Sequence, residues 1–274
     1  MASAFNIILV PVDFTVNTEV AVKKALDLAA PGQTMIYLLH ILTGSTDSDG
    51  AKLIAEQKME AWKMMISDSG EGIKARSVIV SGNNIQADII SRIMSIQPDL
   101  VIVGKTSHHN WMPFLNRLNP SEISGKAAVA VLTVRPGCMN NSIRTVVVPV
   151  DDQLPLGKME ILSTLCKKQR LKIHLVSFSR GGKFPDRTIA TALLNVYQWI
   201  RTVVRCPVEY AVLQGMNKPR TLLSYAEKIN ADTLLLYPES ETRIGWPKRH
   251  IEDLLSPHSK LQVLTVQPPV ESFT

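Results

Sequence analysis

The stretch Asn6-Ile-Ile-Leu-Val-Pro-Val-Asp13 returns in the second half of the 274-residue chain as Arg144-Thr-Val-Val-Val-Pro-Val-Asp151. Each copy is a short apolar run that closes on Pro, Val and Asp. A continuous apolar run of this length suits a strand buried on both faces, as in a parallel sheet. Both stretches therefore predict the first strand of an α/β unit.

Four further segments recur in the same order. They are Ile36–Ile41 with Ile173–Phe178, Val78–Asn83 with Ala211–Met216, Asp99–Val103 with Asp232–Leu236, and Val131–Pro136 with Val263–Pro268. Ordered internal similarity is the signature of a repeat architecture. The chain is therefore predicted to be a tandem duplication, with domains at residues 1–138 and 143–274 and a turn-forming linker at 135–142.

Segments with helical periodicity separate the apolar runs. The clearest cover residues 17–29, 84–96, 188–203 and 219–229. Asn17 and Asn84 are expected N-caps, and Pro219 is expected near a helix start. The predicted order is β-α-β-α-β-α-β-α-β in each half, with a fourth helix before the closing strand, and this alternation predicts an α/β fold. We expect two tandem doubly wound, Rossmann-like domains, each a five-stranded, mostly parallel sheet with helices on both faces.

Ligands in such sheets bind outside the carboxyl ends of the strands, near the switch in strand order. Asp13, Ile41 and Gly104 are all expected at strand ends. A ligand site is therefore predicted at this edge of the first domain.

Composition indicates an ordinary globular protein, with 45% hydrophobic and 20% charged residues. No apolar run is long enough to predict a membrane span. The chain start lacks a basic segment, so it is predicted to be a strand and not a signal peptide. Cys138, Cys166 and Cys206 are widely spaced and predict neither disulfides nor a zinc site, which suits the cytoplasm.

The formal net charge of +6 lies entirely in the second half, because residues 1–140 hold 12 basic and 12 acidic side chains. Several basic residues gather between positions 167 and 187. Few aromatic residues accompany them, so nucleic-acid binding is not expected. A solvated face is the favoured interpretation, and docking of an anionic partner is the alternative.

The repeated strands resemble those of the universal stress protein family. The resemblance is carried by Val10–Asp13, Leu38–Ile41, Pro98–Gly104 and Val131–Val134, and by Asp151, Ala231–Leu236 and Val263–Val266 in the second half. It covers nearly the whole chain and implies a tandem universal stress protein. By this analogy, the closing strands 131–134 and 263–266 should pair antiparallel and form an internal pseudo-dimer.

Members of the family that bind ATP share a phosphate loop, Gly-x2-Gly-x9-Gly-Ser/Thr, after the fourth strand. Glycines there let backbone N–H groups approach phosphate oxygens. In this chain Gly104 fits the first position, Ser107 replaces the second glycine, and Arg117 and Leu118 stand where Gly-Ser/Thr is expected. A shifted register brings 119–121 there instead, and its proline removes a donor.

The resemblance places Asp13 near an adenosine and Ile41 where its backbone would face adenine. Lys105 and Arg117 could partly replace the lost N–H donors with positive charge. The candidate nucleotide site is therefore Asp13, Ile41, Gly104, Lys105, Ser107 and Arg117. In the second domain only Asp151 survives, so that domain is predicted to be degenerate. The alternative interpretation of both aspartates is an Asx-type turn after a buried strand.

Other motifs predict no catalytic or metal site. His108 and His109 are adjacent but lack a third ligand, so no metal site is expected. Ser179–Lys183 lacks the first glycine of a P-loop, and no hydrolase or zinc-protease motif occurs. Trp111 and Trp246 follow the fourth strand of each domain; a contact surface is the favoured interpretation, and a cap over the ligand cleft is the alternative.

Two functions remain open from the sequence. The favoured hypothesis is a non-enzymatic stress-response protein that acts by regulation or protein interaction. The alternative is an adenine-nucleotide sensor or weak ATPase that binds ATP or AMP through the first domain. No cofactor is certain, no membrane or nucleic-acid partner is expected, and association into a homodimer is left open.

Overall fold

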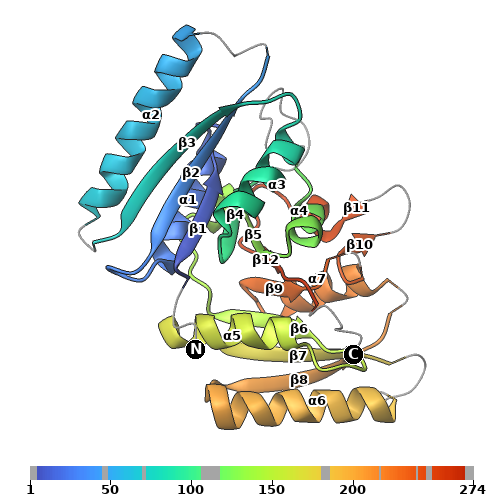
Figure 1. Ribbon diagram of the computed structural model, residues 1–274. Helices are drawn as coiled ribbons and strands as arrows, with labels where there is room; N and C mark the ends of the chain where they lie inside the picture. Colours follow the sequence, from blue (N-terminus) through green and yellow to red (C-terminus); the bar gives the residue numbers. More distant parts are fainter. Residues whose placement is uncertain are drawn as a thin grey trace, which may run out of the picture.

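The computed structural model describes residues 5–44, 49–69, 72–105, 118–179, 186–215, 217–238, 240–244 and 249–268. Its main feature is a ten-stranded sheet with the order β3-β2-β1-β4-β5-β12-β9-β6-β7-β8. Figure 1 shows the first half of the chain at one end of this sheet and the second half at the other. Within the described ranges, every helix is too short or too polar to span a bilayer.

The first half alternates strands and helices as the sequence predicts. Its elements are β1 (Ile7–Pro11), α1 (Val16–Leu28), β2 (Met35–Leu42), α2 (Asp49–Asp68), β3 (Lys74–Ser81), α3 (Ile85–Ile96), β4 (Leu100–Gly104), α4 (Pro120–Ala127) and β5 (Ala130–Val134). Neighbouring strands pair in parallel throughout this half. The strand order reverses between β1 and β4, which is where a doubly wound sheet opens its ligand crevice.

The second half follows the same strand order but departs from the expected helix pattern at its end. Its elements are β6 (Thr145–Pro149), α5 (Leu156–Lys168), β7 (Lys172–Phe178), α6 (Arg187–Trp199) continued by the π-helical turn η3 (Ile200–Val204), β8 (Val208–Leu213), α7 (Lys218–Lys228), β9 (Thr233–Leu236) and β12 (Gln262–Thr265). The linker holds a short 3-10 helix, η2 (Pro136–Cys138).

The expected fourth α-helix of the second half is not found among the described residues between β9 and β12. They form a small hairpin, β10 (Arg243–Ile244) with β11 (Arg249–His250), and a 3-10 helix, η4 (Ile251–Leu254). Pro257 follows closely, and a proline disfavours helical geometry in the residue before it. This helix was therefore predicted wrongly.

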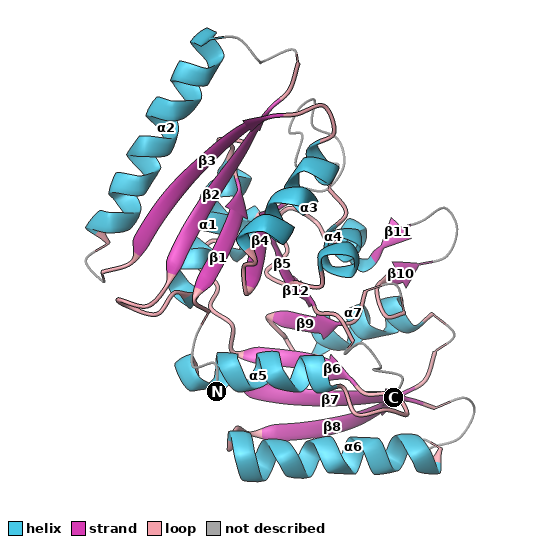
Figure 2. Ribbon diagram, in the orientation of Figure 1, coloured by secondary structure: helices cyan, strands magenta, loops and turns pink. Residues whose placement is uncertain are grey.

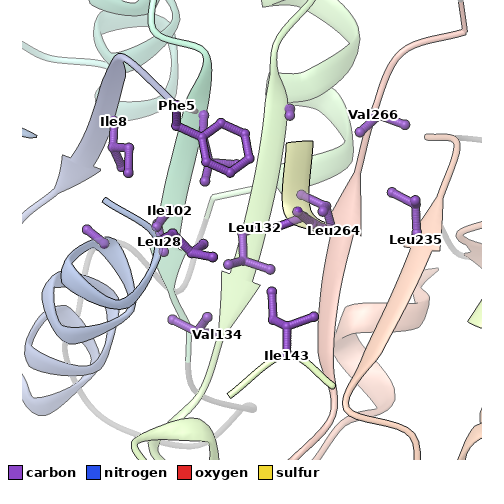
Figure 3. Close-up of a cluster of buried hydrophobic side chains, with 14 of the residues drawn as sticks. Phe5, Ile8, Leu28, Ile102, Leu132, Val134, Ile143, Leu235, Leu264 and Val266 are labelled. Carbon is purple, nitrogen blue, oxygen red and sulfur yellow. The ribbon is translucent and has the colours of Figure 1, made fainter. Parts of the chain in front are cut away.

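The two halves join through their closing strands. β5 and β12 pair antiparallel, with Leu132 opposite Leu264. Figure 3 shows these two side chains in one layer that continues from the first half to the second. The prediction that residues 131–134 and 263–266 pair across an internal pseudo-dimer is confirmed.

Helices cover both faces of the sheet, as Figure 2 shows. On one face α1, α2, α5 and α6 pack over a single apolar core that includes Ile8, Leu132 and Leu264. On the other face the core is divided: α3 and α4 cover the first half, and α7 and η4 cover the second. Alternate residues of each strand therefore enter different cores, which explains the unbroken apolar runs in the sequence.

The helix caps agree with the sequence in part. Asn84 caps α3 by accepting a hydrogen bond from the Ala87 N–H at 3.2 Å, as predicted. Pro219 is the second residue of α7, also as predicted. Asn17 is not an N-cap: α1 begins one residue earlier, with Thr15 in the cap position, and Asn17 lies buried in the first turn.

Candidate functional site

Asp13 follows β1, and its carboxylate organises the start of α1. Oδ1 accepts hydrogen bonds from the Thr15 N–H at 3.1 Å and from the Thr15 and Thr18 hydroxyls, each at 2.6 Å. This is the Asx-type turn that the sequence offered as an alternative. Oδ2 is buried and has no hydrogen-bond partner among the described residues. One carboxylate oxygen is therefore left for a donor that the described part of the chain does not supply.

A pocket of about 220 Å³ lies at the carboxyl end of β2, beside the buried Ile41. Phe14 and His40 form an aromatic wall, with ring centroids 4.6 Å apart, and the Lys58 ammonium lies 5.0 Å from the Phe14 centroid. Burial lowers the pKa of His40, whose Nδ1 is 2.7 Å from the Val12 carbonyl oxygen. The neutral imidazole therefore donates to that carbonyl, and the pocket suits a flat, weakly polar ring.

Gly104 ends β4 at the point where α1 comes closest to the sheet. A Cβ atom on Gly104 would lie 2.1 Å from the Asn17 carbonyl oxygen and 2.5 Å from its carbonyl carbon. No side chain fits there without moving the backbone of α1. Helix packing alone therefore requires glycine at this position, whether or not a ligand binds.

Lys105 turns away from the first-half crevice. Its Nζ lies 2.8 Å from Oδ1 of Asp253, which belongs to η4 of the second half. Burial raises the pKa of Asp253, but the Lys105 ammonium and the contacts with His250 together outweigh it, and the net pKa lies below its usual value. The positive charge that could have replaced lost phosphate donors thus has a carboxylate partner within the chain.

The start of α4 is closed by groups of the protein itself. The Asn119 side chain accepts from the Glu122 N–H at 3.1 Å, and its Nδ2 lies 3.2 Å from Nε2 of His250 in the second half. Pro120 is the first helical residue and supplies no N–H. The buried Ser121 hydroxyl contacts Thr242 Oγ1 at 3.1 Å. The first turn of α4 is therefore engaged with the second half.

A buried polar cluster continues this contact between the halves. The Arg135 guanidinium donates to the carbonyl oxygens of Lys105 and Glu252. The Glu252 side chain is fully buried, and Ser121 Oγ lies 3.3 Å from its Oε1. Burial raises the pKa of Glu252 and lowers that of Arg135. Charged groups at this depth are stable only when their partners are in place, so the cluster fixes the two halves relative to each other.

In the second half the crevice that corresponds to the first is filled. The fully buried Lys158 ammonium lies 2.7 Å from both carboxylate oxygens of Glu241 and 2.9 Å from the Pro149 carbonyl oxygen. Glu241 Oε2 also accepts from the Tyr237 N–H at 2.7 Å. The Tyr237 ring lies over the Lys158 ammonium, 4.3 Å from its centroid. These side chains occupy the carboxyl ends of β6 and β9.

Sequence reasoning missed both members of this ion pair. Lys158 falls in a helix where a lysine ordinarily faces solvent, and no spacing links it to Glu241. Asp151, the matched aspartate, forms a half-exposed ion pair with Lys218 at 3.0 Å. Among the described residues its carboxylate accepts no hydrogen bond from the start of α5, whereas Asp13 accepts three at the start of α1, so the two repeats differ here in chemistry.

The basic cluster of the second half is partly engaged within the chain. Lys168 donates to the Ala29 carbonyl oxygen of the first half, and Lys172 lies 2.7 Å from Glu209. These contacts reduce the charge offered to an external partner. Docking of an anion on this face stays a prediction.

Several predicted positions lie outside the described residues. They are Ser107, Arg117, His108, His109, Trp111 and Trp246. Of the six candidate nucleotide residues, Asp13, Ile41 and Gly104 lie at neighbouring strand ends, whereas Lys105 contacts the other half. Across the described ranges, no three His, Cys, Asp or Glu side chains gather as a metal site would require.

Comparisons with known proteins agree with this fold. The Universal stress protein family model matches residues 4–135, and no curated protein matches the chain. A universal stress protein from Archaeoglobus fulgidus DSM 4304 aligns with a TM-score of 0.70 and 18% identity, over 96% of this chain and 98% of its own.

Two further solved structures align over almost the whole length. A functionally unknown protein from Pseudomonas aeruginosa PAO1 gives a TM-score of 0.60 at 16% identity, over 97% of this chain and 94% of its own. The cytoplasmic domain of a prokaryotic cation chloride cotransporter gives 0.58 at 13% identity, over 97% and 96%. At such identities the likeness concerns the fold. The similarity at the level of sequence lies in the first half of the chain, where residues 4–135 match the universal stress protein family.

Proposed function

We propose that this protein is a non-enzymatic stress-response protein that acts by regulation or protein interaction. The observation that carries the proposal is the engagement of Lys105 with Asp253 at 2.8 Å. A phosphate group would have to displace this partly buried carboxylate. The α4 start supports the same view, because Asn119 caps it and Pro120 lacks a donor. Helix N-termini bind anions through free N–H groups, and the start of α4 offers fewer of them because of this cap and this proline.

The filled crevice of the second half supports the proposal independently. The Glu241 carboxylate lies at the edge of the sheet where an anionic ligand would enter. Moving a second anion beside it would be repulsive, since the Lys158 charge is already satisfied by two carboxylate oxygens. The second half is thus proposed to serve as a scaffold.

A second candidate function is adenine-nucleotide or nucleoside binding in the first half. In this alternative the bound ATP could also be hydrolysed weakly. The pocket beside Ile41 and the unpartnered Oδ2 of Asp13 favour such binding. A ring in the pocket and a hydroxyl near Asp13 would bind without a phosphate clamp. Adding a triphosphate to such a ligand would raise its binding affinity little.

The three cysteines are all unpaired. We propose the cytoplasm as the compartment, because free thiols persist in a reducing environment.

Titration calorimetry separates the two functions. Wild-type protein and Asp13→Asn would each be titrated with ATP and Mg²⁺ and, separately, with adenosine. Asp13→Asn keeps an oxygen acceptor for Thr15 and Thr18, so α1 should remain folded. We expect no ATP binding at concentrations that detect ~100 μM affinity, about 5.5 kcal/mol.

ATP binding near one site per chain, weakened in Asp13→Asn, would overturn the favoured function and establish the nucleotide sensor. Adenosine binding without a gain from the triphosphate would instead support the nucleoside form. A parallel assay of ATP hydrolysis addresses the enzymatic alternative directly.

A further inference from the structure

Helix α2 carries exposed apolar side chains near both of its ends. Leu53, Ile54, Met64 and Met65 are between 51% and 59% exposed, and they form the largest group of such side chains on any described helix. Exposed apolar side chains scattered singly are ordinary, but two pairs of them on the same side of one helix indicate a contact surface.

These side chains lie opposite the face that holds α2 on the sheet. Its buried side chains are Ala55, Met59 and Ile66, and the last two belong to the apolar core on that face of the sheet. With 100° between successive residues, Ile54, Gln57, Ala61 and Met64 fall on the outward face. Gln57 and Ala61 are exposed as well. We call these four residues the α2 stripe; Leu53 and Met65 flank it.

The spacing of the α2 stripe is that of one helix packing along another. Positions 54, 57, 61 and 64 follow the a and d places of a heptad, which is the repeat that packs two long helices side by side. Figure 1 shows α2 at the outer edge of the sheet beyond β3, with the rest of the described chain on its other side. The helix spans 20 residues, so a partner helix could lie along about 30 Å of it.

The α2 stripe is complementary to itself. In an antiparallel pair of α2 helices related by a two-fold axis near residue 59, Ile54 of one copy faces Met64 of the other. Gln57 then faces Ala61, and the small alanine permits close approach at the centre. A symmetric dimer requires such a self-complementary patch, whereas an unrelated partner does not. The flexible methionines can fill the remaining gaps.

Charges on the flanks of the stripe do not oppose this pairing. Glu60 lies close to the axis, but its carboxylate is already 2.7 Å from the Lys63 ammonium of the same helix. Lys58, on the other flank, leans over the Phe14 ring. The formal net charge of +6 lies in the second half of the chain, and the first half, which carries α2, has equal numbers of acidic and basic side chains.

We propose that two copies of this chain associate through antiparallel packing of their α2 helices. The surface is smaller than a standard interface, so the expected affinity is in the range of ~10–100 μM. This contact is separate from the internal β5–β12 junction, and it stands whether or not a nucleotide binds in the first half.

Sedimentation equilibrium of the full chain tests the proposal, at protein concentrations from about 1 to 500 μM, which bracket that affinity. The wild type should pass from the 30.3 kDa monomer to the dimer. Met64→Glu should weaken the association at least ~10-fold, because it places a carboxylate in the apolar layer. Met94→Glu is the matched control: Met94 is a methionine on α3 with 57% exposure against 59% for Met64.

A charge-pair variant tests the orientation. Ile54→Lys combined with Met64→Glu puts opposite charges face to face only in the antiparallel arrangement, and it should restore dimerisation lost in Met64→Glu. A wild type that stays monomeric throughout the range would overturn the proposal. So would a dimer unaffected by Met64→Glu, or one lost equally in Met94→Glu. Circular dichroism of each variant confirms that α2 remains helical, as expected for exposed positions.

Discussion

The Lys105 ammonium lies 2.8 Å from the carboxylate of Asp253, and this pair joins the end of β4 in one half of the molecule to η4 in the other. In the sequence Lys105 sits where positive charge could assist a phosphate. In the structure it is one of the contacts that join the two halves. The residue that follows β4 therefore has a structural partner within the chain, and the sequence after it lacks the glycine-rich pattern of a phosphate loop.

The Lys105–Asp253 pair should stabilise the folded chain measurably. Asp253→Asn removes the charge while keeping the side-chain shape, and it should lower the free energy of unfolding by about 1–3 kcal/mol. Urea denaturation measures the change. The matched control is Lys126→Met, which breaks the exposed Lys126–Glu122 pair and should cost no more than about 0.5 kcal/mol. Equal losses in both variants would mean that the contact between the halves is weaker than its geometry indicates.

Much of the fold could be predicted because its signal is local and repeated. The two Val-Pro-Val-Asp strands and the paired closing strands are short apolar runs rich in β-branched residues, which is the pattern of strands buried on both faces. The helix expected between β9 and β12 was wrong, since only a short 3-10 helix forms before Pro257. A 3-10 helix of a few residues is too short to leave a periodic pattern in the sequence, so the sequence could not distinguish it from an α-helix.

The site was less predictable because its decisive contacts are long-range. Asp13, Ile41 and Gly104 could be placed at strand ends from the sequence. The partners of Lys105 and Lys158 could not be predicted, because each partner lies far from its lysine in the sequence. Either lysine would also suit a solvated surface. A buried ion pair leaves no pattern in the neighbouring residues, so only the folded structure brings its members together.

The buried Lys158–Glu241 pair should behave as a unit. Glu241→Gln leaves the buried ammonium without a counter-charge and should lower the free energy of unfolding by about 3–5 kcal/mol. The glutamine still offers an oxygen to the Tyr237 N–H, so the loss reports mainly on the charge. Combining Lys158→Met with Glu241→Gln should cost clearly less than the sum of the two single changes. Additive losses in chemical denaturation would show that the two side chains do not act together.

Glycine at position 104 should be required for folding rather than for a ligand. Gly104→Ala would bring a Cβ atom to 2.1 Å from the Asn17 carbonyl oxygen, and we expect a loss of roughly 3 kcal/mol or more. Gly50→Ala in α2 is the control, because a Cβ there has no atom within 4 Å. Alanine at that helical position should stabilise by about 0.5–1 kcal/mol. A thermal unfolding midpoint unchanged by Gly104→Ala would remove the packing explanation.

Stability should decline in mild acid because His40 is buried in its neutral form. Burial lowers the pKa of His40 below 6.5, so the unfolded chain binds the proton more readily than the folded one. The stabilising contribution is complete above pH 6.5. It is lost as pH falls from 6.5 to the folded-state pKa, by about 1.4 kcal/mol for each unit of lowering.

His40→Asn isolates this effect, because an asparagine N–H can still donate to the Val12 carbonyl oxygen but does not titrate. Unfolding free energies of the wild type and this variant would be measured by urea denaturation between pH 8 and pH 5. The difference between the two should shrink as pH falls, since the wild type alone loses the His40 contribution. Burial also lowers the pKa of His174, so the variant should keep a smaller slope of the same sign. Parallel curves across the range would show that His40 takes up its proton as easily in the folded pocket as in the unfolded chain.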